Sequence, residues 1–184
     1  MIFLCDNYHQ ASKDLAYTLQ VAGCDATTVV INPDGFLPKG TQSPFTYYVE
    51  DQDETGKPRF FNQVPVPAFW EISGNNQVAQ VSNLTEERAR ITFPEESKVR
   101  IVKSVEWLDK SGKVRQVDHY NKYGFCFAKT THDENGQPVF TSYQTKEGDE
   151  RILENHATGD ILLTLPGQSL RRFANRTEFV KAFL

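Results

Sequence analysis

The spacing of hydrophobic and polar positions changes once along this chain of 184 residues. In the first part, an apolar run at 2–5 indicates a buried strand, apolar positions recur at helical spacing over 9–22, and a β-branched run at 26–31 indicates a second strand. Ser12 is a candidate N-cap, and Gly23 stands where a C′ glycine would end the helix. The apolar face of this helix would consist of Leu15, Leu19 and Ala22. Together these segments predict two parallel strands joined by a crossover helix.

After 32–35, helical spacing gives way to short alternating segments separated by turns. Each turn contains a glycine that can take a positive φ, usually after an Asp or another polar residue. The turns are Asp53–Gly56, Asp109–Gly112, Asp133–Gly136, Lys146–Gly148 and Thr158–Asp160. Glycines at 112, 124, 136, 148 and 159 are spaced by the length of one strand plus one turn. We therefore predict a meander of six or more antiparallel strands.

Alternation within these segments predicts which side chains share a face of the sheet. Three such sets are Val99, Ile101, Val105 and Trp107, then Tyr123, Phe125 and Phe127, then Ile161, Leu163 and Leu165. The segment 62–90 is less regular, because Pro65 and Pro67 exclude a central strand there. The residues 69–72 are expected to form an edge strand or a packed loop. The spacing of Leu84, Arg88 and Ile91 allows one helical turn around Glu86.

The C-terminal residues predict a short helix. Asn175 and Glu178 have capping-box spacing. An apolar face follows, formed by Phe179, Val180, Phe183 and Leu184. This helix either docks on the sheet or continues into a longer protein, and we expect the second. The predicted fold class is α+β: a Rossmann-like start at 1–34, an antiparallel sheet domain at 35–170, and a helix at 171–184 that returns to the first unit.

Composition narrows the functional classes. Hydrophobic residues make up 39% of the chain and charged residues 24%, which fits a packed globular fold. A net charge of −4 argues against nucleic acid as a partner. The three cysteines, Cys5, Cys24 and Cys126, lack the spacing of a zinc site or a disulfide framework and favour a reducing compartment. Neither a secretion leader nor a membrane span is recognisable in the sequence.

Candidate chemistry is sparse. The run His132-Asp133-Glu134 falls in a turn and is typical of solvated loop residues, so we expect no metal site. Cys126 could act as a nucleophile only beside His119 or His156, and a core position is favoured instead. The turn after the first strand, 6–11, contains no glycine, which disfavours a phosphate-binding loop. We therefore predict no catalytic residues and no cofactor.

A proline-rich and aromatic segment at 65–70 is the most distinctive local feature. It could be core packing under a loop, or it could be an exposed ledge that binds a peptide or a sugar, since Trp is enriched at interface anchors. An unpaired strand edge offers a second route, because an extended peptide can join it. The candidate residues for binding an acceptor or a partner are Asn62, Phe69, Trp70 and Glu71.

Several longer motifs resemble one family over essentially the whole chain. They are the run 62–74 (NQVPVPAFWEISG), Arg88–Ile91 (RARI), Tyr120–Gly124 (YNKYG), Phe127–Lys129 (FAK) and Glu154–Asp160 (ENHxxGD). This sequence is similar to the N-terminal part of the B subunit of the accessory-Sec glycosylation complex of Gram-positive bacteria. The resemblance implies a GT-B fold whose first Rossmann-like domain carries an inserted, extended β-sheet domain.

The resemblance also implies a function. The B subunit is a non-catalytic, chaperone-like partner of a catalytic A subunit, and together they add N-acetylglucosamine to Ser/Thr of serine-rich repeat adhesin polypeptides. The implied location is the cytoplasm, with the inner face of the cell membrane left open for the full complex. Two alternatives remain: the acceptor-side half of an active retaining glycosyltransferase, as in teichoic-acid enzymes, and a free-standing carbohydrate-binding β domain. The turn at 6–11 departs from the glycine-containing turn of the catalytic relatives.

Overall fold

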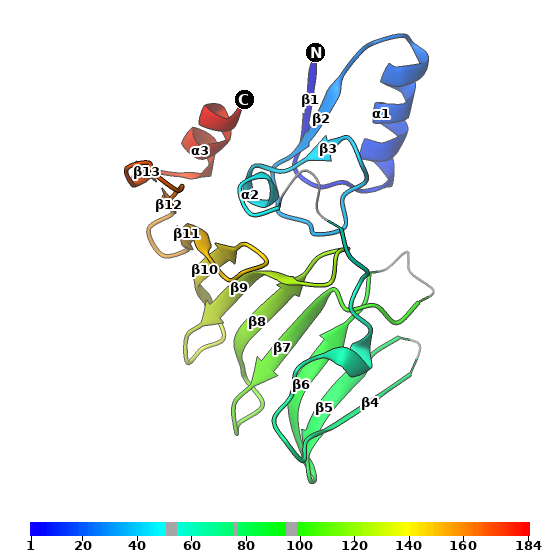
Figure 1. Ribbon diagram of the computed structural model, residues 1–184, viewed down its shortest axis with the longest axis vertical. Coiled ribbons are helices and arrows are strands. Elements are labelled where there is room, and N and C mark those ends of the chain that lie inside the picture. Colours follow the sequence, from blue (N-terminus) through cyan, green and yellow to red (C-terminus); the bar gives the residue numbers. More distant parts are fainter. Residues whose placement is uncertain (51–54, 76, 95–98) are drawn as a thin grey trace.

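Two β-sheets make up the computed structural model, which describes residues 1–50, 55–75, 77–94 and 99–184 (Figure 1). A small parallel sheet with the order β1-β2-β3 lies at one end of the elongated molecule, and a ten-stranded antiparallel sheet extends from it. The fold class is α+β, as predicted. The predicted turn at 53–56 begins among residues outside the described ranges. No helix of the described residues is long and apolar enough to cross a bilayer.

The parallel unit forms as its pattern predicts. Its elements are β1 (Ile2–Cys5), α1 (Gln10–Val21), β2 (Thr27–Val30) and β3 (Thr41–Gln42). Strand β1 runs parallel to β2 with Ile2 opposite Thr27. Gly23 follows the helix with a φ of 74°, the conformation expected of a C′ glycine.

Two details of this unit differ from the prediction. The N-cap of α1 is His9, whose Nδ1 accepts the amide of Ser12 at 3.2 Å, so Ser12 lies inside the first turn. The strand β1 is not buried, because Ile2 is 50% and Leu4 42% exposed. Leu15 on α1 is also exposed. Apolar spacing identified these elements correctly, but among the described residues no element covers these side chains.

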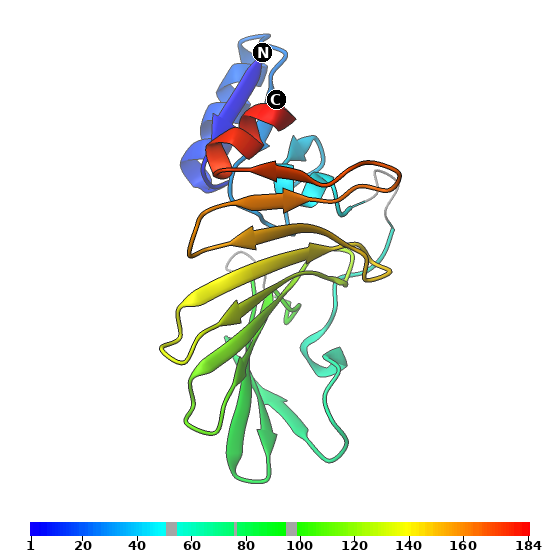
Figure 2. The ribbon, with the colours of Figure 1, turned by 90° about the vertical axis from the view of Figure 1, so that its left-hand side faces the viewer.

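The large sheet is a simple meander in which each strand pairs with its neighbours in sequence (Figures 1 and 2). Its strands are β4 (Glu71–Gly74), β5 (Ala79–Asn83), β6 (Glu86–Thr92), β7 (Ser104–Leu108), β8 (Val114–Tyr120), β9 (Cys126–His132), β10 (Pro138–Gln144), β11 (Glu150–Asn155), β12 (Ile161–Leu163) and β13 (Arg171–Phe173). Strands β4 and β13 are its two edges. The prediction of six or more antiparallel strands is confirmed.

Two local predictions are wrong, the second of them in part. The segment around Glu86 is not helical, because β5 and β6 form a hairpin there, with Ala79 opposite Ile91. The spacing of Leu84, Arg88 and Ile91 resembles that of a helix, but Leu84 lies in the two-residue turn and the other two lie in β6. The shared face predicted for Val99, Ile101, Val105 and Trp107 holds for Val105 and Trp107, which both belong to one hydrophobic cluster, but not for Val99, which is 50% exposed.

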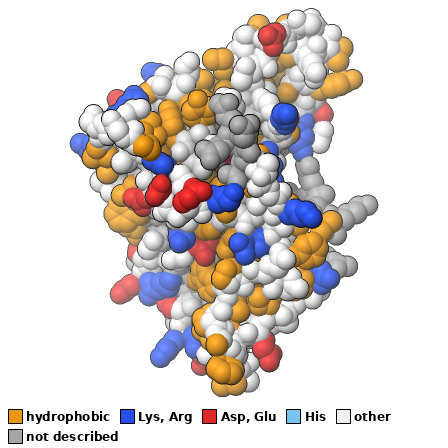
Figure 3. Space-filling model, viewed as in Figure 1, with side chains coloured by type: hydrophobic (Ala, Val, Ile, Leu, Met, Phe, Trp, Pro, Cys, Tyr) orange, Lys and Arg blue, Asp and Glu red, His pale blue; other side chains and the backbone are white. Residues whose placement is uncertain are grey.

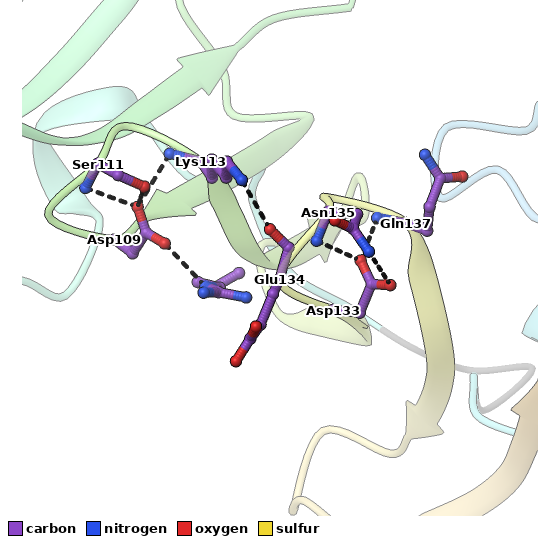
Figure 4. A network of polar contacts seen from close by, with 8 residues as sticks. Asp109, Ser111, Lys113, Asp133, Glu134, Asn135 and Gln137 are labelled. Atoms are coloured by element: carbon purple, nitrogen blue, oxygen red, sulfur yellow. Dashed lines mark hydrogen bonds and ion pairs between the residues drawn. The ribbon is translucent and has the colours of Figure 1, made fainter.

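Aspartates hold two of the predicted hairpin turns in place. In the β7–β8 turn, Asp109 Oδ1 accepts the amides of Ser111 and Lys113 at 2.8 and 3.0 Å, and Asp133 makes the corresponding contacts in the β9–β10 turn (Figure 4). Lys113 Nζ donates to the carbonyl of Glu134 at 2.9 Å and joins the two turns. The hydrogen bond from the Ser111 side chain and the backbone contacts hold the pKa of Asp109 well below its usual range.

Two hydrophobic clusters stabilise the two ends of the large sheet. The first lies between the β9–β13 end and the helices α2 (Pro44–Tyr47) and α3 (Arg176–Phe183), with Phe45, Tyr143 and Phe179 at its centre. Asn175 caps α3 by accepting the amide of Glu178 at 3.0 Å, as predicted. The second cluster lies over β5–β8 and receives Val64 from the segment before β4. The helix α3 therefore docks on the sheet through Phe179, and Val180 is buried as well, whereas Leu184 of the predicted apolar face is 50% exposed.

A buried polar chain crosses the sheet between these clusters. His119 Nε2 contacts Thr130 Oγ1 at 2.9 Å, Thr130 contacts Thr141 Oγ1 at 2.9 Å, and Thr141 contacts His156 Nε2 at 2.8 Å. Burial lowers the pKa of His119 to about 4, and the nearby carboxylate of Asp118 only partly offsets this effect. The folded protein therefore keeps this imidazole neutral at neutral pH.

This burial makes stability depend on pH. Unfolded His119 takes up a proton near pH 6.5, whereas the folded side chain does so only near pH 4. As the pH falls through that window, we expect the free energy of unfolding to decrease by about 1 kcal/mol per pH unit on account of this residue. Urea titrations at several pH values measure the free energy of unfolding, and its decrease with falling pH should be smaller for His119→Gln than for the unchanged protein. An equal decrease in both proteins would contradict the role given to His119.

Candidate partner-binding surface

The four candidate residues lie at the β4 end of the large sheet. Asn62 is exposed on a 3-10 helix, η1 (Phe61–Gln63), which lies against β4. Glu71 is the exposed first residue of β4 and pairs with Ser82. The structure thus brings Asn62 and Glu71 onto neighbouring elements, since η1 contacts β4 at the edge of the large sheet away from β13.

Phe69 is the most exposed of the aromatic side chains described, at 96%. Its φ of 68° is unusual for a residue other than glycine and costs on the order of 1 kcal/mol. Leu84, in the two-residue turn between β5 and β6, shares both properties, with 91% exposure and a φ of 56°. Phe69 lies two residues before Glu71 and Leu84 two residues after its partner Ser82, so both flank the same end of the β4–β5 pair. We call Phe69 and Leu84 the tip pair.

Hydrophobic side chains are visible at this end of the molecular surface (Figure 3). Two large apolar side chains held in water on a strained backbone are costly to keep unless they are covered by a partner. Phe69 is recognisable as a candidate from the sequence, but Leu84 is not, because the β5–β6 turn Leu84-Thr85 contains no glycine or proline to mark it. Val81 and Ala89, two buried apolar residues that pair across that turn, are the signal that could have revealed the hairpin.

Trp70 differs from its neighbours, because its ring packs against the second hydrophobic cluster and is only partly exposed. The guanidinium carbon of Arg88 lies 5.9 Å from the centroid of this ring, and Arg88 also forms an ion pair with Glu86. The Trp70 amide donates to the carbonyl of Pro67 at 3.2 Å, which fixes the turn that projects Phe69. Trp70 thus anchors the residues next to Phe69 to the second hydrophobic cluster.

The edge of β4 adjoins the tip pair. One side of β4 pairs with β5 from Glu71 to Gly74, and no strand among the described residues pairs with the other side. A free edge of this kind can accept an extended segment by main-chain hydrogen bonding. Apolar anchors and strand edge together therefore suit a polypeptide partner better than a small molecule.

Among the described residues, no group of three or more His, Cys, Asp or Glu side chains could hold a metal ion. The thiol of Cys126 packs against the second cluster, and burial raises its pKa to about 12. A thiol with this pKa remains protonated at neutral pH and is a poor nucleophile. Cys126 accordingly serves packing.

Comparison with known proteins identifies the family. The model of the GtfB N-terminal domain matches residues 2–48, and that of the GtfB middle domain matches 70–174. Proteins named "UDP-N-acetylglucosamine--peptide N-acetylglucosaminyltransferase stabilizing protein GtfB" from Streptococcus pneumoniae and Streptococcus gordonii are 54% and 50% identical to the chain. The matches cover 100% of this chain and 41% of each relative, so the chain spans about two fifths of their length.

Solved structures agree with this result. The crystal structure of a GtfA/B complex bound to UDP and GlcNAc contains a chain with a TM-score of 0.95 and 49% identity, matched over 100% of this chain and 41% of that one. The pneumococcal O-GlcNAc transferase GtfA shares the fold at a TM-score of 0.53 and 13% identity, over 99% of this chain and 39% of its own. The chain belongs to the GtfB family, and it contains the N-terminal and middle domains of that family.

Proposed function

We propose that the protein containing this chain is a non-catalytic subunit that stabilises a protein O-glycosyltransferase and helps it recognise its acceptor. The catalytic partner would add N-acetylglucosamine to Ser/Thr of a serine-rich repeat adhesin. The exposed tip pair beside the free edge of β4 is the observation that carries this proposal, because it is an unpartnered apolar surface suited to a polypeptide.

The occupant of this surface is the catalytic subunit in our proposal. The similar chain at 49% identity was crystallised within a GtfA/B complex, which supports a partner of that kind. Asn62, Phe69, Trp70 and Glu71 remain the proposed recognition residues, and Leu84 joins them. The complex would act in the cytoplasm, at or near the inner face of the cell membrane.

An active glycosyltransferase is the less favoured alternative. The turn between β1 and α1 contains no glycine and places Tyr8 where a phosphate would need close access to backbone amides. A free-standing carbohydrate-binding domain would not need an apolar tip next to a strand edge. Glycosyl transfer from UDP-N-acetylglucosamine by the full-length protein without its partner would favour the enzymatic alternative.

The tip pair provides the first binding test. Replacing both Phe69 and Leu84 by alanine should weaken association with the catalytic subunit by about 2 kcal/mol, because two exposed apolar anchors are lost. Titration calorimetry with purified subunits measures this change. Leu170→Ala is the matched control, since Leu170 is 60% exposed in the loop before the opposite edge strand β13. Equal affinities for the double variant and the control would contradict the assignment.

Trp70 provides a second test with a different outcome. Because its ring belongs to the second cluster, Trp70→Ala should lower the free energy of unfolding by about 2 kcal/mol as well as weaken binding. Thermal unfolding and calorimetry on the same preparation separate the two effects. Should Trp70→Ala unfold as the unchanged protein does, the supporting role of this side chain is wrong.

A further inference from the structure

Two histidines are connected through the large sheet by two threonines. His119 lies on β8, Thr130 on β9 and Thr141 on β10, and His156 directly follows β11. These four strands are neighbours in the sheet (Figure 2). Three hydrogen bonds of 2.9, 2.9 and 2.8 Å join the two Nε2 atoms through the two hydroxyl groups. Both threonines are buried, at 9% and 5% exposure, so water does not replace a partner that either of them loses.

The number of hydrogen atoms fixes how this chain of bonds can be oriented. Each threonine hydroxyl has one hydrogen to donate, so the two hydroxyls supply two of the three hydrogen atoms that the bonds need. The third must come from Nε2–H of one histidine, and Nε2 of the other must accept. While both rings are neutral, the ring that accepts at Nε2 carries its hydrogen at Nδ1. The hydrogen positions of His119 and His156 are therefore coupled.

A proton on His156 selects one of the two orientations. The charged ring carries a hydrogen on both nitrogens, so its Nε2–H must donate to Thr141. Both hydroxyl groups then donate toward β8, and Nε2 of His119 becomes the final acceptor. Burial lowers the pKa of His119 to about 4, whereas His156 adjoins an exposed turn at 157–158, so His156 takes up the first proton. With both rings charged, one buried hydroxyl would lose its acceptor.

The charged and titratable groups around His119 do not change this order. Asp118 points to the opposite face of the sheet, where its carboxylate accepts from Trp107 Nε1 at 2.7 Å. Lys103 and His132 both disfavour a positive charge on His119. His119 also lines a cavity between the two sheets. The other titratable side chains that line this cavity are Tyr8, His9, Lys13, Asp34, Lys103 and Tyr120.

The groups around His156 are already paired. Glu154 and Asp160, the carboxylates closest to it in the sequence, each form an ion pair with an arginine. From β10, Tyr143 donates its hydroxyl to Glu154 at 3.2 Å. Among the described residues, only the two threonines hydrogen-bond to either imidazole ring. No other contact therefore holds the chain in one orientation while both rings are neutral.

We propose that these four side chains form a proton-controlled relay that crosses the sheet from His156 to His119. Because Nε2 of His119 is held by Thr130, the polar ring atom left to face the cavity is Nδ1. When His156 is charged, that atom is a hydrogen-bond donor. When His156 is neutral, both orientations are open and the same atom can also accept. The relay thus makes the hydrogen-bonding character of the cavity wall depend on a proton bound three strands away, and it does not depend on the proposed function.

Nuclear magnetic resonance of the full-length protein, with 15N in its histidine rings, tests the relay. The chemical shift of a ring nitrogen distinguishes a nitrogen that carries hydrogen from a bare one, and spectra of His119→Gln and His156→Gln assign the signals. As His156 takes up its proton, the Nε2 signal of His119 should move toward the position of a bare nitrogen. Direct protonation of His119 moves the same signal in the opposite direction, so the sign of the movement identifies the relay.

Thr141 offers a matched pair of variants. Thr141→Val preserves the shape of the side chain without the hydroxyl and should abolish the response of His119, whereas Thr141→Ser keeps the hydroxyl and should preserve it. A His119 signal that does not respond to the proton on His156, or that responds equally in Thr141→Val, overturns the relay. The sign of the movement in the unchanged protein requires no variant, so it remains decisive if Thr141→Val does not fold.

Discussion

Replacing Arg176 by alanine is expected to lower the free energy of unfolding by about 4 kcal/mol, because the change leaves a buried carboxylate without its counter-charge. Glu154 is only 3% exposed, and both of its carboxylate oxygens accept hydrogen bonds from the Arg176 guanidinium. After the substitution, the hydrogen bond that this carboxylate keeps among the described residues would be the one from the Tyr143 hydroxyl at 3.2 Å.

Arg176 also joins the two sheets. Its Nη1 donates to Asn32 Oδ1 at 2.7 Å, and Asn32 in turn donates to Asn7 on the loop that enters α1. The guanidinium carbon lies 5.2 Å from the centroid of the Phe45 ring in α2. One side chain at the start of α3 thus contacts the large sheet, the parallel unit and α2. Its loss should therefore loosen the contact between α3 and the parallel unit as well as destabilise the chain.

The matched control for this prediction is Arg172→Ala. Arg172 forms an ion pair with Asp160, but its side chain is 69% exposed, so its loss should change the free energy of unfolding by less than about 1 kcal/mol. Combining Arg176→Ala with Glu154→Gln should recover part of the loss, because no uncompensated charge remains buried. Urea denaturation at neutral pH measures all three variants. A similar cost for Arg176→Ala and Arg172→Ala would contradict the role of the buried pair.

Turn chemistry made most of this fold predictable from the sequence. Aspartates and glycines at a regular period identify hairpin turns because both residue types act locally, through backbone conformation and hydrogen bonds within a few residues. The meander has no crossover connections, so local turns nearly determine its topology. The β5–β6 hairpin was missed because its turn, at Leu84, lacks that chemistry.

Contacts between distant parts of the chain were not predictable in this way. The pairing of Arg176 with Glu154 looks in the sequence like two ordinary surface charges, since nothing local marks either as buried. The exposure of Phe69 and the burial of Trp70 depend on which face of the β4 end meets the second cluster, and two adjacent aromatics do not encode that choice. A cavity between the two sheets likewise combines segments near residues 8, 34 and 119 that have no common motif.

The large sheet connects the tip pair, at its β4 edge, with the parallel unit, which lies near β8 and β9. This connection is fixed only if the large sheet keeps one orientation relative to the parallel unit. The segment 57–59, which follows the parallel unit in the chain, packs against the β8–β9 turn.

Gly124 in that turn is the position where a single methyl group should disturb this arrangement most. A Cβ there would lie 2.3 Å from the carbonyl oxygen of Lys57 and 3.3 Å from the amide nitrogen of Arg59, in a segment more than sixty residues earlier in the chain. Its φ of 89° adds backbone strain for any other residue. Strain and overlap together should lower the free energy of unfolding by about 4 kcal/mol in Gly124→Ala.

Gly136 offers a control that isolates the effect of packing. It occupies the corresponding place in the next predicted turn with a φ of 80°, yet a Cβ there would meet no atom within 4 Å. Gly136→Ala should therefore cost about 1 kcal/mol, from backbone strain alone. Urea denaturation of both variants gives the difference, which we attribute to the contact with the segment 57–59. If the two variants are equally stable, that segment yields without cost, and the β8–β9 turn does not fix the orientation of the sheet.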